Sequence, residues 1–182
     1  MSGAERLARA VELRTDFDAA FARTPDPATP PQLDLLVIRV GEHRYALRLS
    51  EVLAVHADRK LVAVPSPRSD LLGLVGLRGV IAPVYDLRLL LGYPAAGTPR
   101  WLAHVRAAGP LAVAFELFEQ HLRLPLADVM SASGSDGAAH RFVTGSAPSA
   151  TGPLSIIDLP AVYQEVTSGT RRLTATEREG TS

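Results

Sequence analysis

Short apolar stretches separated by turn residues dominate this sequence, and they limit the folds that the chain can adopt. Leu33 to Val40 is an apolar run of strand length, followed by the turn residues Gly41 to His43. Tyr45, Leu47 and Leu49 then alternate with their neighbours, which is the period expected of a half-buried strand. These segments predict a β-hairpin near the start of the folded region.

The centre of the chain repeats glycine at every third position. Leu71 to Val84 is apolar but contains Gly73, Gly76 and Gly79, a pattern that suits bent strands or a close backbone approach better than a helix. Further short strands are expected at Trp101–Val105, Leu111–Phe118, Leu122–Leu126, Phe142–Thr144 and Leu154–Ile157. Many short strands at close spacing predict a mainly β fold of small barrels and not a βαβ fold.

Three polar residues are placed to cap short helical segments between these strands. They are Ser50, before a turn carrying Val52 and Val55; Asp86, before Leu87–Leu91; and Asp158, before a helix to about Val166. Gly92 stands where glycine commonly ends a helix.

The chain divides into three parts. Residues 1–31 contain an amphipathic pattern over 4–23, with Leu7, Val11 and Phe21 on one stripe, and then a proline-rich linker. Residues 32–168 form the folded domain, with two strand-rich lobes at about 33–95 and 96–168, and residues 169–182 are a polar tail. The helix is expected either to dock on its own domain or to bind a partner.

Composition excludes several classes of protein. Lys and Arg number 19, as do Asp and Glu, so no basic excess supports nucleic-acid binding. Cysteine is absent, which removes disulfide scaffolds and thiol nucleophiles. The first residues lack the apolar region of a secretory signal, and no segment is long and apolar enough to span a bilayer. We therefore expect a cytoplasmic protein without membrane insertion.

Motifs for catalysis or metal binding are missing. The five histidines do not share the spacing of a zinc site on one helix, and no serine lies in a nucleophile elbow. Gly73, Gly76 and Gly79 do not form a dinucleotide fingerprint. The sequence predicts no enzyme, no metal and no cofactor, although a fold alone never fixes function.

The segment from Leu72 to Leu87 resembles the signature of CheW-like chemotaxis coupling proteins. The matching positions are Gly73, Leu77, Arg78, Gly79, Val80, Pro83, Val84, Asp86 and Leu87. The flanks are similar too, from the Tyr45 hairpin to the closing strand at Leu154, so the resemblance covers about residues 33–168.

This resemblance implies two five-stranded SH3-like barrels and a non-enzymatic adaptor role. Such adaptors couple chemoreceptor cytoplasmic tips to the regulatory domain of a CheA-type histidine kinase, within receptor arrays in the cytoplasm. The residues implied for the kinase-facing surface are Glu51, Val52, Leu53 and Gly73, and those for the receptor-facing surface are Gly76, Leu77, Arg78 and Trp101.

Each of these residues also has a structural interpretation. Arg78 could clamp its own loop, Val52 and Trp101 could be core residues, and the glycines could serve backbone geometry alone.

The sequence departs from the family pattern at three positions. Gly76 replaces an asparagine, Ala54 replaces an acidic residue, and Glu116 replaces an aspartate. With the extra residues 1–31, these departures leave open a divergent binding module whose different partner docks through the N-terminal helix.

Overall fold

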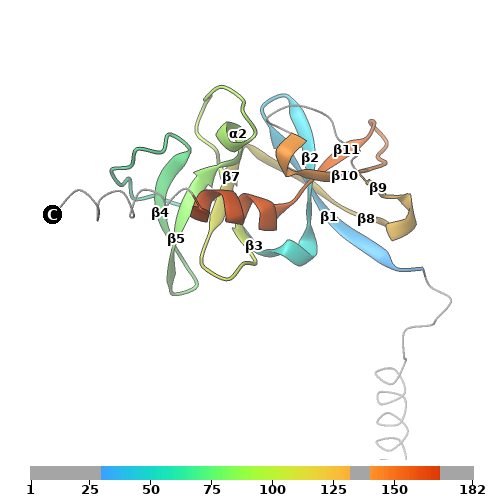
Figure 1. The fold of residues 1–182 in the computed structure, drawn as a ribbon, viewed down its shortest axis with the longest axis horizontal. Helices are drawn as coiled ribbons and strands as arrows, with labels where there is room; N and C mark the ends of the chain where they lie inside the picture. The colour runs from blue at the N-terminus through green and yellow to red at the C-terminus, as the bar shows by residue number, and fades with distance from the viewer. Residues whose placement is uncertain (1–29, 132–139, 169–182) are drawn as a thin grey trace, which may run out of the picture. The chain divides into compact units, whose positions relative to one another are not determined.

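The computed structural model describes residues 30–131 and 140–168. The chain separates into two units, Met1–Pro31 and Gln32–Ser182. The helix expected over 4–23, most of the linker after it and the polar tail expected after 168 lie outside the described residues. All strands of the described residues belong to the second unit (Figure 1).

Two β-sheets form this unit. The first has six strands in the order β8-β1-β2-β11-β10-β9, and the second has five in the order β3-β6-β7-β5-β4. Their bounds are β1 Gln32–Val40, β2 His43–Arg48, β3 Val52–Ala57, β4 Leu71–Leu77, β5 Val80–Asp86, β6 Trp101–Val105, β7 Ala112–Phe115, β8 Leu117–Pro125, β9 Met130–Ser131, β10 Val143–Ala147 and β11 Leu154–Ile157. The mainly β prediction is confirmed, although one sheet has six strands where five were expected.

The first sheet joins segments that are far apart in the sequence. Strand β8 pairs antiparallel with β1, and β11 pairs parallel with β2. The second sheet uses residues 52–115 alone. The lobe boundary expected at 95/96 therefore differs from the boundary between the sheets, because β1 and β2 pair with the later strands and not with β3.

The short helices agree only in part with expectation. Helix α2, Leu87–Leu90, begins at Asp86, whose carboxylate accepts the backbone N–H of Arg88. The turn expected around Val52 and Val55 is wrong, because both residues lie in β3. Only a 3₁₀ turn, η1 Leu49–Glu51, precedes that strand, and no side chain caps it. Two further 3₁₀ turns are η2 Leu126–Asp128 and η3 His140–Phe142, so Phe142 precedes β10 as part of a turn.

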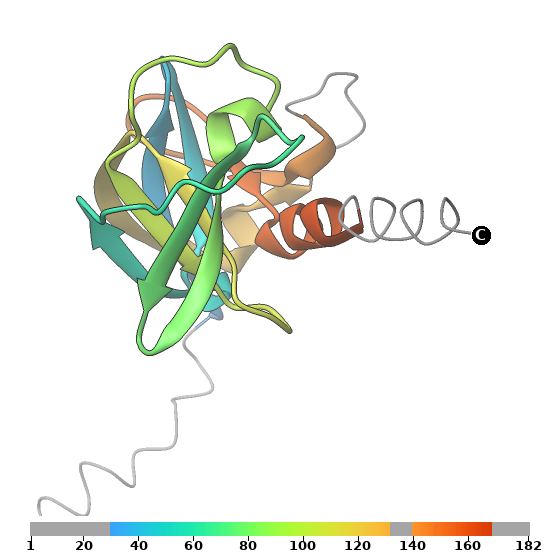
Figure 2. The ribbon, with the colours of Figure 1, turned by 90° about the vertical axis from the view of Figure 1, so that its left-hand side faces the viewer.

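A helix over residues 159–168 covers the junction of the sheets (Figures 1 and 2). Asp158 caps it by accepting the backbone N–H of Ala161 at 2.9 Å, as expected. Its apolar face, Leu159, Val162 and Val166, is buried in a cluster that also takes side chains from both sheets. Burial of this face ties the two sheets into one core.

Candidate protein-binding surface

The hairpin of β4 and β5 carries the signature segment. Leu77 pairs with Val80, so Arg78 and Gly79 form a two-residue turn at its tip. Both have positive φ, 50° for Arg78 and 84° for Gly79, as the tight turns that suit twisted hairpins require. A residue other than glycine costs roughly 1–2 kcal/mol in this conformation, so the position is unfavourable for Arg78 as a purely structural residue.

The four residues implied for a kinase-facing surface have different environments. Val52 is buried in the core, and Gly73 has a φ of 141° and packs against the backbone of Val62. Glu51 bonds Arg48 at 3.1 Å and accepts the backbone N–H of Leu159. Leu53 is 38% exposed, so its side chain is the one of the four that is available to a partner.

The residues implied for a receptor-facing surface also differ in their exposure to solvent. Leu77 is buried, and Trp101 is half-buried and packs against Phe118 at 5.8 Å between ring centroids. Gly76 and Arg78 are exposed. Arg78 makes no hydrogen bond or ion pair with any residue between 30 and 131 or between 140 and 168. The clamp interpretation of Arg78 therefore has no contact to support it in this part of the chain.

Sequence reasoning missed an apolar face on the same hairpin. Gly76 pairs with Ile81, Leu74 pairs with Pro83, and Val62 forms a bridge with Leu74. Residues directly opposite each other in antiparallel strands share a face, so these five residues form one surface, here called the hairpin face. Ile81 is 68% exposed and Val62 is 64% exposed. The apolar run was visible in the sequence, but no signal showed which of its residues point outward.

The second sheet and its connecting segments carry more positive than negative side chains. Residues 52–115 contain seven Lys and Arg but three Asp. Asp58 pairs with Arg100, Asp70 pairs with Arg68, and Asp86 caps α2. Among the described residues, the cations of this sheet without a carboxylate partner are Arg59, Lys60, Arg78 and Arg106.

Two histidines on neighbouring strands lie within the electrostatic influence of Arg78. Burial and the positive charge of Arg78 lower the pKa of His104, and burial, Arg59, His104 and Arg78 lower that of His56. Both rings are therefore neutral near pH 7. His104 Nδ1 and His56 Nε2 are buried and have no hydrogen-bond partner among the described residues.

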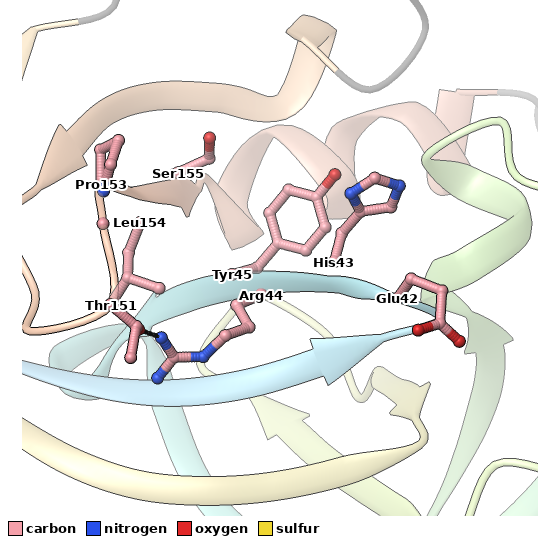
Figure 3. A pocket seen from close by; sticks show the side chains of 9 residues that line it. Glu42, His43, Arg44, Tyr45, Thr151, Pro153, Leu154 and Ser155 are labelled. Carbon is pink, nitrogen blue, oxygen red and sulfur yellow. Dashed lines mark hydrogen bonds between the residues drawn. The ribbon is translucent and has the colours of Figure 1, made fainter.

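A polar pocket of about 340 Å³ opens on the first sheet, between β2 and residues 151–155 (Figure 3). Arg44 crosses it and bonds Thr151 and, at 2.7 Å, Glu119. The hydroxyl of Tyr45 lies 2.6 Å from that of Tyr93, and burial raises the pKa of Tyr45 well above its ordinary value. The Arg44 contact joins β2 to the loop at Thr151, and the Tyr45 contact joins β2 to Tyr93. The residues that line the pocket include no nucleophile paired with a base.

Residues 30–131 and 140–168 hold no group of three or more His, Asp or Glu side chains placed to bind a metal ion. The helices in these ranges do not meet the length and apolarity that a bilayer crossing requires. The hairpin thus combines an exposed apolar face with one cation, Arg78, that has no carboxylate partner among the described residues, which is a composition suited to binding another protein.

Comparison with known proteins agrees with this class. The CheW-like domain model matches residues 34–167. The chain is 33% identical over 60 residues to the chemotaxis protein CheW of Bacillus subtilis (strain 168), covering 33% of this chain and 38% of the relative. It is 29% identical over 68 residues to a probable chemotaxis protein CheW of Rhizobium etli, covering 37% and 44%. The aligned part thus spans less than half the length of these relatives.

The fold matches a solved structure as well. The crystal structure of the scaffolding protein TtCheW from Thermoanaerobacter tengcongensis superposes with a TM-score of 0.65 at 21% identity, covering 72% of this chain and 91% of that chain. Because the family model spans most of the folded domain, the chain belongs to the CheW-like domain family.

Proposed function

We propose that this protein is a non-enzymatic adaptor in chemotaxis-type signalling. It couples the cytoplasmic tip of a chemoreceptor to the regulatory domain of a CheA-type histidine kinase, in the cytoplasm at receptor arrays. Membership of the CheW-like family supports this role, as does similarity to a scaffolding protein. Both partners are proteins, and the mechanism is affinity and geometry alone.

The observation that carries the proposal is the tip of the β4–β5 hairpin. Arg78 adopts a left-handed conformation with a φ of 50°, yet it gains no hydrogen bond or ion pair among the described residues. Unfavourable backbone conformations that persist without an internal contact are concentrated at binding sites. A partner contact at the tip supplies the interaction that the isolated protein lacks.

The residues proposed to contact each partner are those whose side chains are exposed to solvent. Arg78 and Gly76 contact the receptor at the tip and beside it, and buried Leu77 supports them from the core. Half-buried Trp101 pairs with Phe115 of β7, toward the end of the sheet away from the tip. Leu53 contacts the kinase from β3, and Val62 and Ile81 of the hairpin face offer the kinase a second apolar docking surface. An interface of ordinary size buries about 800 Å² on each partner and depends on a few apolar anchors, and Ile81 is suited to be one of them.

The test replaces one exposed apolar side chain and uses a matched control. Ile81→Ser removes an exposed side chain from the hairpin face, and Met130→Ser removes one of similar exposure, 68% against 72%, from the first sheet. We expect Ile81→Ser to weaken binding of the kinase regulatory domain about tenfold, which is roughly 1.4 kcal/mol. Met130→Ser should bind like the wild type. Equal effects of both variants would contradict the assignment of the surface.

The alternative is a different partner that docks through residues 1–31. These residues form a unit separate from Gln32–Ser182, so their removal leaves the CheW-like domain in place. If the shortened chain binds the kinase regulatory domain as the whole chain does, residues 1–31 are accessory. Binding of neither kinase nor receptor by the folded full-length protein would favour the alternative.

A further inference from the structure

Two histidines of the second sheet lie on the face that covers an apolar core. His104 of β6 pairs with Ala54 of β3, and His56 of β3 pairs with Leu102 of β6. Side chains opposite each other in an antiparallel pair share a face, as do those two residues apart on one strand. Leu102 packs in an apolar cluster with Val75, Leu77, Ala82, Val84, Ala112 and Ala114. His56 and His104 are therefore diagonal neighbours on the side of the sheet that faces this cluster.

The surroundings of both rings disfavour an additional proton. His104 is 6% exposed, and its Nδ1 is buried with no hydrogen-bond partner among the described residues. Arg59 Nη2 lies 3.4 Å from His56 Nδ1, and a guanidinium only donates, so Nδ1 accepts and the neutral ring carries its proton on Nε2. That Nε2 is also buried and unpartnered within 30–131 and 140–168. Because an imidazolium donates from both nitrogens, protonation leaves each ring with a buried N–H that has no acceptor in these ranges.

The charges that act on the two rings also oppose protonation. Arg59 follows β3 and acts on His56, and Arg78, at the hairpin tip, acts on both rings. His104 acts on His56 as well, so a proton on one ring opposes a proton on the other. Burial and these positive charges lower the pKa of both histidines, so both are neutral near pH 7. Strands β4 and β7 contain no charged side chain.

The acids of this sheet are engaged elsewhere. Asp58 forms two hydrogen bonds of 2.9 Å with Arg100, and Asp70 forms bonds of 2.9 and 2.6 Å with Arg68. Asp86 is buried and caps α2. A protonated histidine on the covered face would take its counter-ion only by breaking one of these contacts. A buried cation without a partner is costly, so protonation favours any state in which the rings reach water.

Strand β3 is the element that can give the rings access to water. It ends the five-stranded sheet and pairs with β6, whereas β6 also pairs with β7. Separation of β3 breaks one ladder of hydrogen bonds, and local openings of this kind need less free energy than global unfolding. We propose that β3 separates from β6 when either His56 or His104 binds a proton, while the rest of the domain stays folded.

This opening has a consequence for partner binding. Leu53, the residue proposed to contact the kinase, lies in β3. Acid should therefore weaken kinase binding, because only the fraction of molecules with β3 in place is competent to bind. The effect on the kinase rests on the proposed adaptor function, whereas the opening of β3 does not.

Amide hydrogen exchange of the full-length protein tests the opening without a partner. In separated β3 the rings reach water and their pKa returns to about 6.5, so the opening constant should rise as pH falls through that value. Between pH 7.5 and pH 5.5 the rise is up to about tenfold for each ring. After correction for intrinsic rates, amides of β3 should show this rise and exchange faster than those of β1 at both pH values. Equal rates for β3 and β1 at pH 5.5 would mean global unfolding and would overturn the proposal.

Three histidine variants assign the response to these rings. His104→Leu removes one titrating ring from the apolar face, and His56→Gln removes the other, so each should reduce the effect of acid on β3 exchange. The variant with both changes should keep β3 exchange within about twofold between the two pH values. His121→Gln is the matched control, because His121 is an exposed histidine of β8, and it should respond like the wild type. A wild-type response in both His56→Gln and His104→Leu would overturn the proposal, and either variant alone suffices if the other fails to fold.

Calorimetry then tests the consequence for the kinase. The Kd for the isolated kinase regulatory domain should rise between pH 7.5 and pH 5.5 for the wild type, and it should rise less for the variant that lacks both rings. Comparing the two proteins removes any effect of pH on the kinase domain itself. An equal rise in both would refute the link between β3 opening and kinase binding. Failure of the wild type to bind at pH 7.5 would refute the proposed function, and hydrogen exchange, which needs no partner, would still decide whether β3 opens.

Discussion

Replacement of Gly73 by alanine should destabilise the protein, because the backbone at this position is closely packed. A Cβ atom at this residue would lie 2.4 Å from the backbone oxygen of Val62, and its φ of 141° is one that side chains rarely adopt. That oxygen accepts the N–H of Leu74 at 2.8 Å, and Val62 donates back to Leu74 at 2.8 Å. Gly73→Ala therefore cannot be accommodated without opening the bridge between the segment after β3 and strand β4.

The magnitude follows from these two effects. Two backbone hydrogen bonds contribute about 2 kcal/mol, and the backbone conformation costs a side chain a further 1–3 kcal/mol or so. Gly73→Ala should therefore lower the free energy of unfolding by about 3–5 kcal/mol in urea denaturation. Gly76→Ala is the matched control, because nothing lies within 4 Å of its added Cβ, and it should change stability little.

A loss below about 1 kcal/mol for Gly73→Ala would refute this reasoning. Gly73 would then be free to serve as a contact residue and not as a backbone requirement. A loss of the expected size, with kinase binding retained by the folded fraction, would instead show that Gly73 acts through the bridge to Val62.

Three further results are expected. Arg78→Gly should raise the free energy of unfolding by roughly 0.5–1 kcal/mol, because glycine tolerates the left-handed turn; a decrease in urea denaturation would revive the clamp interpretation. Glu51→Ala should lower the free energy of unfolding by about 1 kcal/mol, because the backbone N–H of Leu159 loses its acceptor. An unchanged midpoint of thermal unfolding would contradict that role. His56 and His104 have pKa values below the ordinary 6.5, so the folded state binds fewer protons than the unfolded state and stability should fall as pH drops below about 6.5. His104→Leu should flatten that dependence when denaturation is compared at pH 7.5 and 5.5, and an equal dependence in both proteins would exclude His104 as its source.

Local features of the fold could be predicted from the sequence because they depend on neighbouring residues. The turn at Gly41 joins β1 and β2 as the alternation of Tyr45 and Leu47 indicated. Asp86 caps α2 and Asp158 caps the last helix as expected. In each case one side chain and a short apolar pattern determine the geometry.

Long-range pairing could not be predicted in the same way. Nothing within Gln32–Val40 shows that it pairs with Leu117–Pro125, because many strands offer similar apolar edges. The secondary structure expected at Val52 was also wrong, since a short apolar run fits a helical turn or a strand equally well. In the structure Val52 is a buried residue of strand β3.

The candidate site shows the same limit. Resemblance to a family located the signature segment, but only the structure separated exposed Arg78 from buried Leu77. Ile81 was overlooked because an alternating pattern defines two faces without showing which one is covered. The pairing of Ala54 with His104 depends on strand register and had no local signal.

The proposed adaptor role requires that this chain bind a CheA-type kinase. The most direct measurement is isothermal titration calorimetry of the full-length protein against the isolated regulatory domain of such a kinase from the same organism. We expect a saturable isotherm with one-to-one stoichiometry and a Kd near the micromolar range, which corresponds to a binding free energy of about −8 kcal/mol. Absence of binding heat at several temperatures, with both proteins shown to be folded, would contradict it.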